Sequence, residues 1–132
     1  MVHQEQITFD TTGHRQMDDL TDKVAAIVER SGITTGIVQV CCVGSTAAVG
    51  TIEFEPGLER DLPEMLDRLI PPSRDYGHER AWHDGNGTRT CRPRCSDRRS
   101  RCPWLRESRY WAHGSRFVIL SVMFDHAAAR WW

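Results

Sequence analysis

The composition of the chain changes sharply at Gly87, and this break limits what the whole can fold into. Residues 1–87 carry 7 Lys and Arg against 15 Asp and Glu, whereas residues 88–132 carry 10 Arg against 3 acids. Three of the five cysteines and four of the five tryptophans also follow Gly87. A folded domain keeps its hydrophobic pattern along its whole length. The sequence therefore predicts a regular acidic body and an atypical tail rich in Arg, Cys and Trp.

The size and net charge of the chain limit the classes of protein to which it can belong. Its 132 residues predict a single domain over 1–132, long enough to bury a core without cross-links. The net charge of −1 argues against a nucleic acid or a membrane surface as partner. No apolar run is long enough to span a bilayer, and the first ten residues lack the pattern of a signal peptide. We therefore expect a cytoplasmic protein.

The first part of the body predicts one strand and one helix. Residues Ile7–Thr11 have β character and are expected to form a short edge strand. Acids and cap residues then predict a helix from about Thr21 to Ser31, ended by Gly32. The apolar side chains that follow helical spacing are expected in the core: Leu20, Val24, Ile27 and Val28.

Two further strands are predicted next. Gly36–Val43 is apolar at nearly every position, which is typical of a central strand that is buried on both faces. Its Cys41 and Cys42 are expected as thiols in the core. Val49–Phe54 predicts the following strand, and the two strands are expected to form a hairpin-like unit. Between them, Ser45 and Thr46 offer hydroxyl and backbone N–H groups to an anion, although an ordinary turn of small residues explains them equally.

A second helix is predicted to open at residues 55–57. Pro63 lacks an N–H, so Asp61 is an alternative start. Asp67 and Arg68 are expected on a solvated face. A stripe at helical spacing is expected to face the core: Leu58, Leu62, Met65, Leu66 and Leu69.

The stretch Tyr76–Gly87, YGHERAWHDGNG, carries the side chains that argue for chemistry. It follows two prolines and is expected to be a loop. Polar, ligand-type residues on a loop that contains glycine indicate a functional site. The alternative is a solvated loop that happens to be rich in histidine. The candidates are His78, Glu79, His83, Asp84 and Asn86.

Hydrophobic periodicity is lost after Gly87. Thr88–Trp104 alternates arginine and cysteine without an apolar face, and only Phe117–Phe124 predicts a strand. A basic arm for nucleic acid is one interpretation of the tail. A zinc site is another, but its members lack the CxxC spacing that is typical of such sites: Cys91, Cys95, Cys102 and His113.

Three segments of the body, in order, resemble the YjbQ-like family, also called secondary thiamine-phosphate synthases. They are FDTTGHRQMDDLTDKV, VGSTAAVGTIEFEPGLERDLPEML and DYGHERAWHDGNG, and the resemblance covers residues 5–87. It implies an α+β domain with a mixed sheet packed by two helices, assembled as a homotrimer. It also implies a small polar pocket at or near the subunit contacts. Family members join a pyrimidine pyrophosphate to a thiazole phosphate weakly.

The resemblance also implies roles for individual residues. His78, Asp84 and Asn86 fall on family site positions and would be catalytic, while Ser45 and Thr46 would contact a phosphate. His78 and Asp84 would also hold a divalent ion, zinc or magnesium. The expected partner is a small phosphorylated metabolite. A non-enzymatic trimer that binds a metabolite or a metal in the same pocket is the alternative function.

This chain departs from the family pattern at several positions. His83 matches no family site, and many members have histidine where Gly44 stands. The family continues after DGNG with a His-x-His pair, whereas this chain has Thr88-Arg89-Thr90. A chain whose last third does not build the fold, and is inactive, is therefore a third hypothesis.

A shifted reading frame explains these departures together. If one base was dropped at the Gly87 codon, the readings allowed for residues 88–132 include the missing His-x-His pair and the family's Gly-Thr-Trp-Gln motif. The alternative is a divergent basic tail. The shift predicts that residues 88–132 pack poorly, with solvated arginines, unpaired cysteines and a pocket beside His78 that is open on one side. DNA sequencing across the Gly87 codon distinguishes the two.

Overall fold

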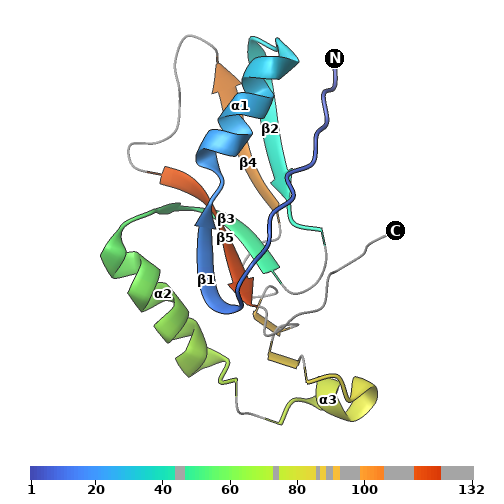
Figure 1. The fold of residues 1–132 in the computed structure, drawn as a ribbon, viewed down its shortest axis with the longest axis vertical. Coiled ribbons are helices and arrows are strands. Elements are labelled where there is room, and N and C mark those ends of the chain that lie inside the picture. Colours follow the sequence, from blue (N-terminus) through green and yellow to red (C-terminus); the bar gives the residue numbers. More distant parts are fainter. Residues whose placement is uncertain are drawn as a thin grey trace.

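The computed structural model describes residues 1–43, 47–72, 75–85, 87–88 and 91–92, and the backbone of two strands at 99–105 and 115–122. Over these residues the fold is α+β, as expected (Figure 1). The strands are β1 (His14–Asp19), β2 (Thr35–Cys41), β3 (Ala47–Glu53), β4 (Arg99–Leu105) and β5 (Ser115–Val122). The helices are α1 (Thr21–Ser31), α2 (Pro56–Leu69) and α3 (Gly77–Trp82).

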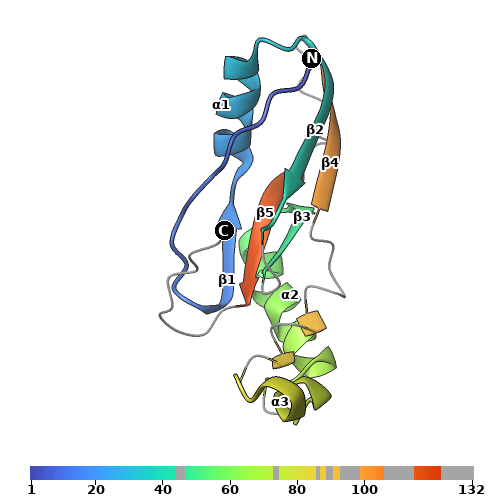
Figure 2. The ribbon, with the colours of Figure 1, turned by 90° about the vertical axis from the view of Figure 1, so that its right-hand side faces the viewer.

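The strands form two small sheets, and every pairing among the described strands is antiparallel. One sheet has the order β1-β5-β3 and the other pairs β2 with β4. Strand β5 is therefore central, between strands from the first half of the chain. Helix α1 lies against the β2-β4 sheet, and α3 lies at the opposite end of the molecule (Figure 2).

Two predictions about strand pairing are wrong. Residues Ile7–Thr11 form no strand, and β1 begins three residues after them, at His14. β2 and β3 do not form a hairpin, because β3 pairs with β5 and β2 pairs with β4. The apolar pattern marks a segment as strand-forming, but its partner is chosen by packing between segments far apart in the sequence.

Strand β2 is buried on one face, whereas the sequence predicted burial on both. Val38 and Val40 pack against the core, while Ile37 on the other face is 75% exposed. Cys41 is exposed, contrary to the expectation of a core thiol, and Cys42 packs partly against the core. The reason is that α1 covers only one face of β2.

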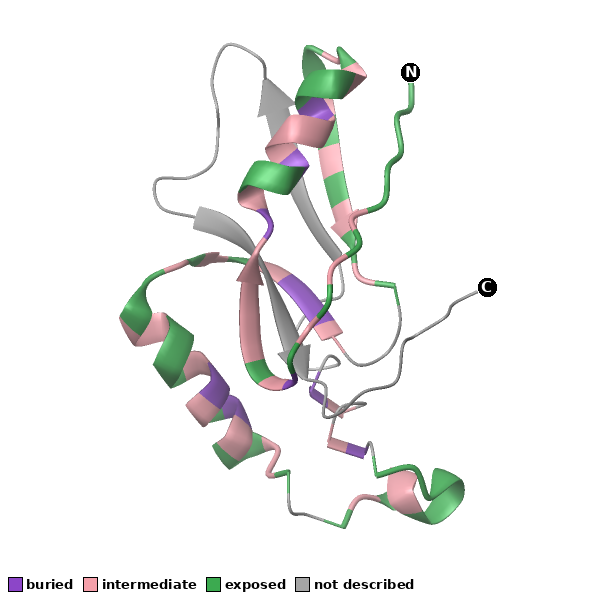
Figure 3. Ribbon diagram, viewed as in Figure 1, coloured by how far each residue is buried: buried purple, intermediate pink, exposed green. Residues whose placement is uncertain are grey.

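The main core forms where α1 meets the strands. Helix α1 has the predicted bounds, and Gly32 ends it with a left-handed φ of 68°. Leu20, just before the helix, and Val24 and Val28 on its inner face are buried against Val49 of β3. Figure 3 shows buried positions on both α1 and β3 in purple. Burying each such side chain contributes about 1.5–3 kcal/mol, so this cluster fixes the helix on the sheet.

Helix α2 begins at Pro56 and not at the alternative Asp61. The Glu55 carboxylate accepts hydrogen bonds from the Gly57 and Leu58 backbone N–H groups, which caps the helix. Proline suits the first helical position because an N–H there would have no helical partner. The predicted core stripe is only partly correct. Leu66 is buried and Leu62 packs on it, but Met65 and Leu69 are exposed.

The last third of the chain contributes to the fold more than expected. The predicted strand Phe117–Phe124 corresponds to β5, displaced by two residues, and it has a partner on each side. Arg92 is only 2% exposed, so the expectation of solvated arginines is wrong at this position. Cys95 and His113 lie outside the described residues. No helix in the described part of the chain has the length and apolar content needed to cross a bilayer.

Candidate functional site

The candidate site is built on α3 and the turn that follows it. The sequence predicted a loop over Tyr76–Gly87, but Gly77–Trp82 is a short helix, so that prediction is wrong for half of the stretch. His83 ends the helix in the left-handed region with a φ of 52°. The chain then turns through Asp84 and Gly85, and this reversal brings the residues after the helix back beside it.

His78 and Asp84 come together at this turn. The two residues were predicted as site residues, and the distance between His78 Nε2 and Asp84 Oδ1 is 3.6 Å. The imidazole is 25% exposed as a whole, yet its Nε2 atom is buried and has no hydrogen-bond partner within the described part of the chain. A separation of 3.6 Å is too long for a hydrogen bond. Buried nitrogens without a partner are rare, because their desolvation is uncompensated.

Glu79, the next residue of the helix, holds the turn in place. Its Oε2 accepts a hydrogen bond of 2.8 Å from the Gly85 N–H, and its Oε1 accepts one of 2.5 Å from the Gly87 N–H. Gly85 has a φ of 67°, a conformation that glycine adopts without strain. The sequence singled out Glu79 as an acid of the stretch but gave it no role.

Trp82 places an aromatic surface beside the imidazole. His78 and Trp82 are four residues apart on one face of α3, and their rings stack with centroids 6.4 Å apart and planes at 26°. The indole is also 71% exposed, which is unusual for a tryptophan. The site therefore combines an imidazole, a carboxylate and an accessible aromatic face.

The donor types of His78 and Asp84 fit a shared divalent cation. Zinc takes imidazole nitrogen and carboxylate oxygen at about 2.0–2.2 Å, which places two ligands of a tetrahedral ion about 3.3–3.5 Å apart. The observed 3.6 Å is close to this separation. Within the described residues, no group of three or more His, Cys, Asp or Glu side chains is arranged to hold a metal ion.

The remaining predicted site residues fall into two groups. Asn86, Ser45 and Thr46 lie outside the described residues. His83 is exposed at the end of α3. The structure thus brings together His78 and Asp84 of the predicted set, and adds Glu79 and Trp82 to the surroundings.

A second group of charged residues surrounds Asp67, which the sequence placed on a solvated face. That prediction is wrong, because the Asp67 side chain is 14% exposed and bridges α2, β1 and residue 92. Its Oδ1 pairs with His14 Nε2 at 3.0 Å and with the Arg92 guanidinium, and its Oδ2 accepts from Arg15 Nε at 2.5 Å. Arg92 also donates to the carbonyl oxygen of Ile70 at 2.8 Å.

Burial and charge shift the pKa values in this Asp67 cluster. Burial alone would raise the pKa of Asp67, but hydrogen bonds from Arg15 and Arg92 outweigh it, so the pKa is lowered. Burial lowers the pKa of His14, and the charge of Arg92 adds to this shift against the opposing effect of Asp67. No local pattern in the sequence predicts this cluster, since its members lie on segments far apart in the chain.

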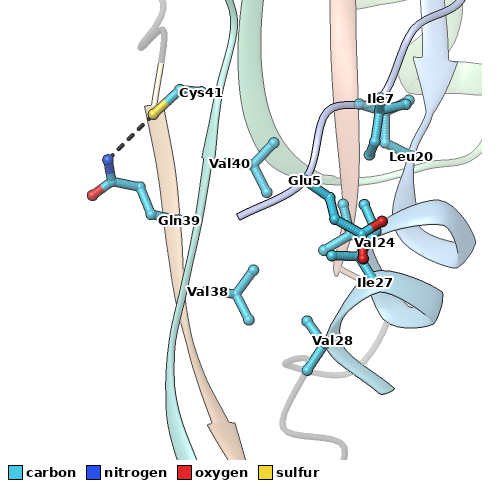
Figure 4. A pocket seen from close by; sticks show the side chains of 10 residues that line it. All are labelled: Glu5, Ile7, Leu20, Val24, Ile27, Val28, Val38, Gln39, Val40 and Cys41. Carbon is cyan, nitrogen blue, oxygen red and sulfur yellow. Dashed lines mark hydrogen bonds between the residues drawn. The ribbon is translucent and has the colours of Figure 1, made fainter. Parts of the chain in front are cut away.

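A separate cavity of about 150 Å³ lies between α1 and β2. Figure 4 shows Val38 and Val40 of β2 facing Val24 and Val28 of α1 across it, while the side chain of Gln39 points to the other side of the strand. Most of its lining is aliphatic, with Glu5 and Gln39 as the polar exceptions, and none of the predicted site residues lines it. The cavity is therefore not the candidate site.

The fold and the site define the class of protein: a small α+β protein with a histidine and a carboxylate at a glycine-bearing turn. A model of the family described as UPF0047 protein YjbQ-like matches residues 5–95. The chain belongs to this YjbQ family. The match extends eight residues beyond the body recognised from the sequence.

Relatives and solved structures agree with this assignment. A UPF0047 protein of Methanothermobacter thermautotrophicus is 32% identical over 77 residues, which are 58% of this chain and 54% of that protein. The UPF0047 protein YugU of Bacillus subtilis is 31% identical over 78 residues, 58% of this chain and 56% of that protein. The matched part of the chain thus spans little more than half the length of these relatives.

Among solved structures, a YbjQ-like protein of unknown function from Sulfolobus solfataricus superposes with a TM-score of 0.80 at 24% identity. The superposition covers 89% of this chain and 85% of that one. A hypothetical protein from Aeropyrum pernix has a TM-score of 0.78 at 24% identity, covering 86% of this chain and 84% of that one. At this identity the likeness establishes the fold alone.

Proposed function

We propose that this protein acts on a small phosphorylated metabolite at the His78–Asp84 turn, with weak thiamine-phosphate synthase activity. The observation that carries the proposal is the buried His78 Nε2, which has no hydrogen-bond partner among the described residues and lies 3.6 Å from Asp84 Oδ1. A buried polar atom without a partner is costly in a structural role. A substrate atom or an ion at this position would supply the missing partner.

The reaction needs groups that His78 and Asp84 can provide. The thiazole nitrogen attacks the carbon that carries the pyrophosphate, the C–O bond breaks, and pyrophosphate leaves with the bonding electrons. A protonated imidazole donates a hydrogen bond to the leaving oxygen and stabilises its developing charge. Asp84 is proposed to orient the imidazole through its negative charge alone, because its Oδ1 lies 3.6 Å from Nε2, beyond hydrogen-bond distance. Neither group forms a covalent bond with the substrate in this scheme.

His78 and Asp84 would also hold a divalent ion, zinc or magnesium, whose charge would neutralise a bound pyrophosphate. This chain departs from the family pattern at Thr88-Arg89-Thr90, where the family has a His-x-His pair. It therefore lacks two imidazoles at these positions. Thr88→His with Thr90→His should therefore strengthen zinc binding by at least tenfold, measured by calorimetry. An unchanged zinc affinity would remove the metal from the proposal.

The exposed indole of Trp82 supports a heteroaromatic substrate. An accessible aromatic face next to a catalytic imidazole offers a stacking surface to a pyrimidine or thiazole ring. The 71% exposure of Trp82 leaves this surface available. Asn86, Ser45 and Thr46 are proposed to bind the polar and phosphate groups of the substrate.

The test is formation of thiamine phosphate from the pyrimidine pyrophosphate and the thiazole phosphate. We expect slow turnover by the unmodified chain and at least a hundredfold loss in His78→Ala, with His83→Ala as the matched control. Tight binding of both substrates without product would instead support the alternative, a metabolite-binding protein. Absence of both binding and turnover would contradict the proposed function.

A homotrimer is proposed as the working assembly. The described residues expose several large apolar side chains, and such side chains mark an association surface where they gather into one patch. They include Ile37, Val43, Met65 and Leu69. Analytical ultracentrifugation should give a sedimenting species of three chains, and a monodisperse monomer at micromolar concentration would contradict the proposal.

A further inference from the structure

We infer that Glu79 is a positioning residue: its carboxylate holds the turn so that Asp84 stays opposite His78. The chemical role of His78 and Asp84 rests on the proposed function, whereas the role of Glu79 in holding the turn does not. Glu79 directly follows His78 on α3. One short helix therefore carries both the imidazole and the group that binds the turn bearing the carboxylate.

The geometry requires a carboxylate with both oxygens available. Oε2 accepts from the Gly85 N–H and Oε1 from the Gly87 N–H, so the two hydrogen bonds span the turn on either side of position 86. A glutamine would present one oxygen and one NH₂ group. The NH₂ group would face a backbone N–H, and two donors repel each other. Glu79→Gln therefore removes one hydrogen bond while keeping the size of the side chain.

Contacts at Gly87 show how closely the turn approaches the helix. A Cβ atom at Gly87 would lie 2.8 Å from Glu79 Oε1 and 2.8 Å from Tyr76 Cβ, closer than real Cβ atoms come. A Cβ atom at Gly77, on the same helix, would meet nothing within 4 Å. The turn can approach Glu79 only because position 87 has no side chain.

Amide hydrogen exchange in the ¹⁵N-labelled full chain tests the inference directly. The Gly85 and Gly87 N–H groups should exchange at least tenfold faster in Glu79→Gln than in the unmodified protein. Glu59→Gln, at an exposed position of α2, is the matched control and should leave both rates unchanged. Equal rates in Glu79→Gln and the unmodified protein would overturn the inference.

Zinc binding, measured by calorimetry, tests whether the turn positions the pair. Loss of an orienting partner typically weakens metal binding 10–100-fold, and we expect this in Glu79→Gln with the melting temperature within a few degrees. Faster exchange with unchanged zinc affinity would overturn the positioning role. If the unmodified chain binds no zinc, the metal part of the proposed function fails, and the exchange rates still decide whether Glu79 holds the turn.

A second pair of variants covers the case in which Glu79→Gln does not fold. Gly87→Ala disturbs the same contact from the side of the turn, and Gly77→Ala is its control because it meets no neighbour. We expect faster exchange at Gly85 in Gly87→Ala and not in Gly77→Ala. Equal exchange in the two variants would contradict the inference.

Discussion

Two groups of charged residues in this protein differ in how completely their polar atoms are paired. In the Asp67 cluster, both carboxylate oxygens accept hydrogen bonds, and the buried Arg92 also donates to a backbone carbonyl. At the turn after α3, the Nε2 atom of His78 is buried, has no hydrogen-bond partner among the residues that the structure describes, and lies 3.6 Å from Asp84. The first group is satisfied within the protein, and the second is not.

The difference separates a structural role from a functional one. Charges that are buried and fully paired tie segments together, and removing one of them leaves the others uncompensated. A buried nitrogen without a partner adds nothing to stability, so a ligand is the better explanation for it. Stability should therefore depend on the Asp67 cluster, and binding should depend on His78.

The largest expected effect is the loss of stability in Asp67→Ala. This change leaves the Arg92 guanidinium, 2% exposed, without its carboxylate partner. Removing one member of a buried ion pair typically costs about 3–5 kcal/mol of unfolding free energy. Urea denaturation measures it, with Asp61→Ala as control, because the Asp61–Arg60 pair is exposed and should contribute little to stability. Equal losses in both variants would show that the cluster is not structural.

His78→Ala should give the opposite result. Thiamine phosphate or zinc binding should fall by at least a hundredfold, measured by calorimetry, because the unpaired Nε2 atom is lost. The melting temperature should stay within a few degrees, since this atom makes no hydrogen bond to any described residue. A large loss of stability with unchanged binding would make His78 a structural residue and would remove the contrast with Asp67.

Trp82→Leu should weaken binding of thiamine phosphate by about tenfold, because stacking on an aromatic ring is worth about 1–3 kcal/mol per base. Trp82→Phe should keep most of the affinity, since it retains an aromatic face. Glycerol phosphate, which has no ring, is the control ligand and should bind both variants equally. Equal losses for the two ligands would mean that Trp82 does not select an aromatic substrate.

The smallest expected effect is the pH dependence of stability that the Asp67 cluster produces. The folded-state pKa of His14 lies below its usual 6.5, so the unfolded chain binds a proton first as the pH falls. The contribution of His14 to the free energy of unfolding is therefore fully present above pH 6.5 and is lost as the pH falls below it. The pKa of Asp67 is also lowered, so its contribution is lost in turn as the pH falls below the usual 3.8. Urea midpoints at pH 7.5 and 5.5 measure the first step. His14→Gln should reduce the difference between them, and an unchanged difference would contradict this assignment.

Local signals in the sequence determined most of the helical structure. The acids and caps before Thr21, the apolar spacing of the segment and Gly32 after it predicted α1 with its bounds. These signals act within one or two turns of the chain, so no distant partner is needed to interpret them. The same holds for Gly85, whose positive φ follows from its place in a tight turn.

Strand pairing was decided only by the tertiary structure. Strand β5 takes β1 on one side and β3 on the other, which joins residues near both ends of the chain. The apolar sequence of β2 does not show that one of its faces is exposed to solvent, because burial depends on which helix packs against which face. For the same reason the predicted hairpin and the predicted edge strand at Ile7–Thr11 were wrong.

The candidate site shows the same division. The sequence alone identified His78 and Asp84 from residue type and from the resemblance to the YjbQ family. It could not show that Nε2 of His78 is buried without a hydrogen-bond partner, or that the Glu79 carboxylate binds two N–H groups of the turn. Residue type sets which bonds a side chain can make, but which bonds it does make depends on the atoms that the folded chain places around it. The Asp67 cluster is the clearest case, since Arg92 reaches Asp67 across 25 residues of sequence.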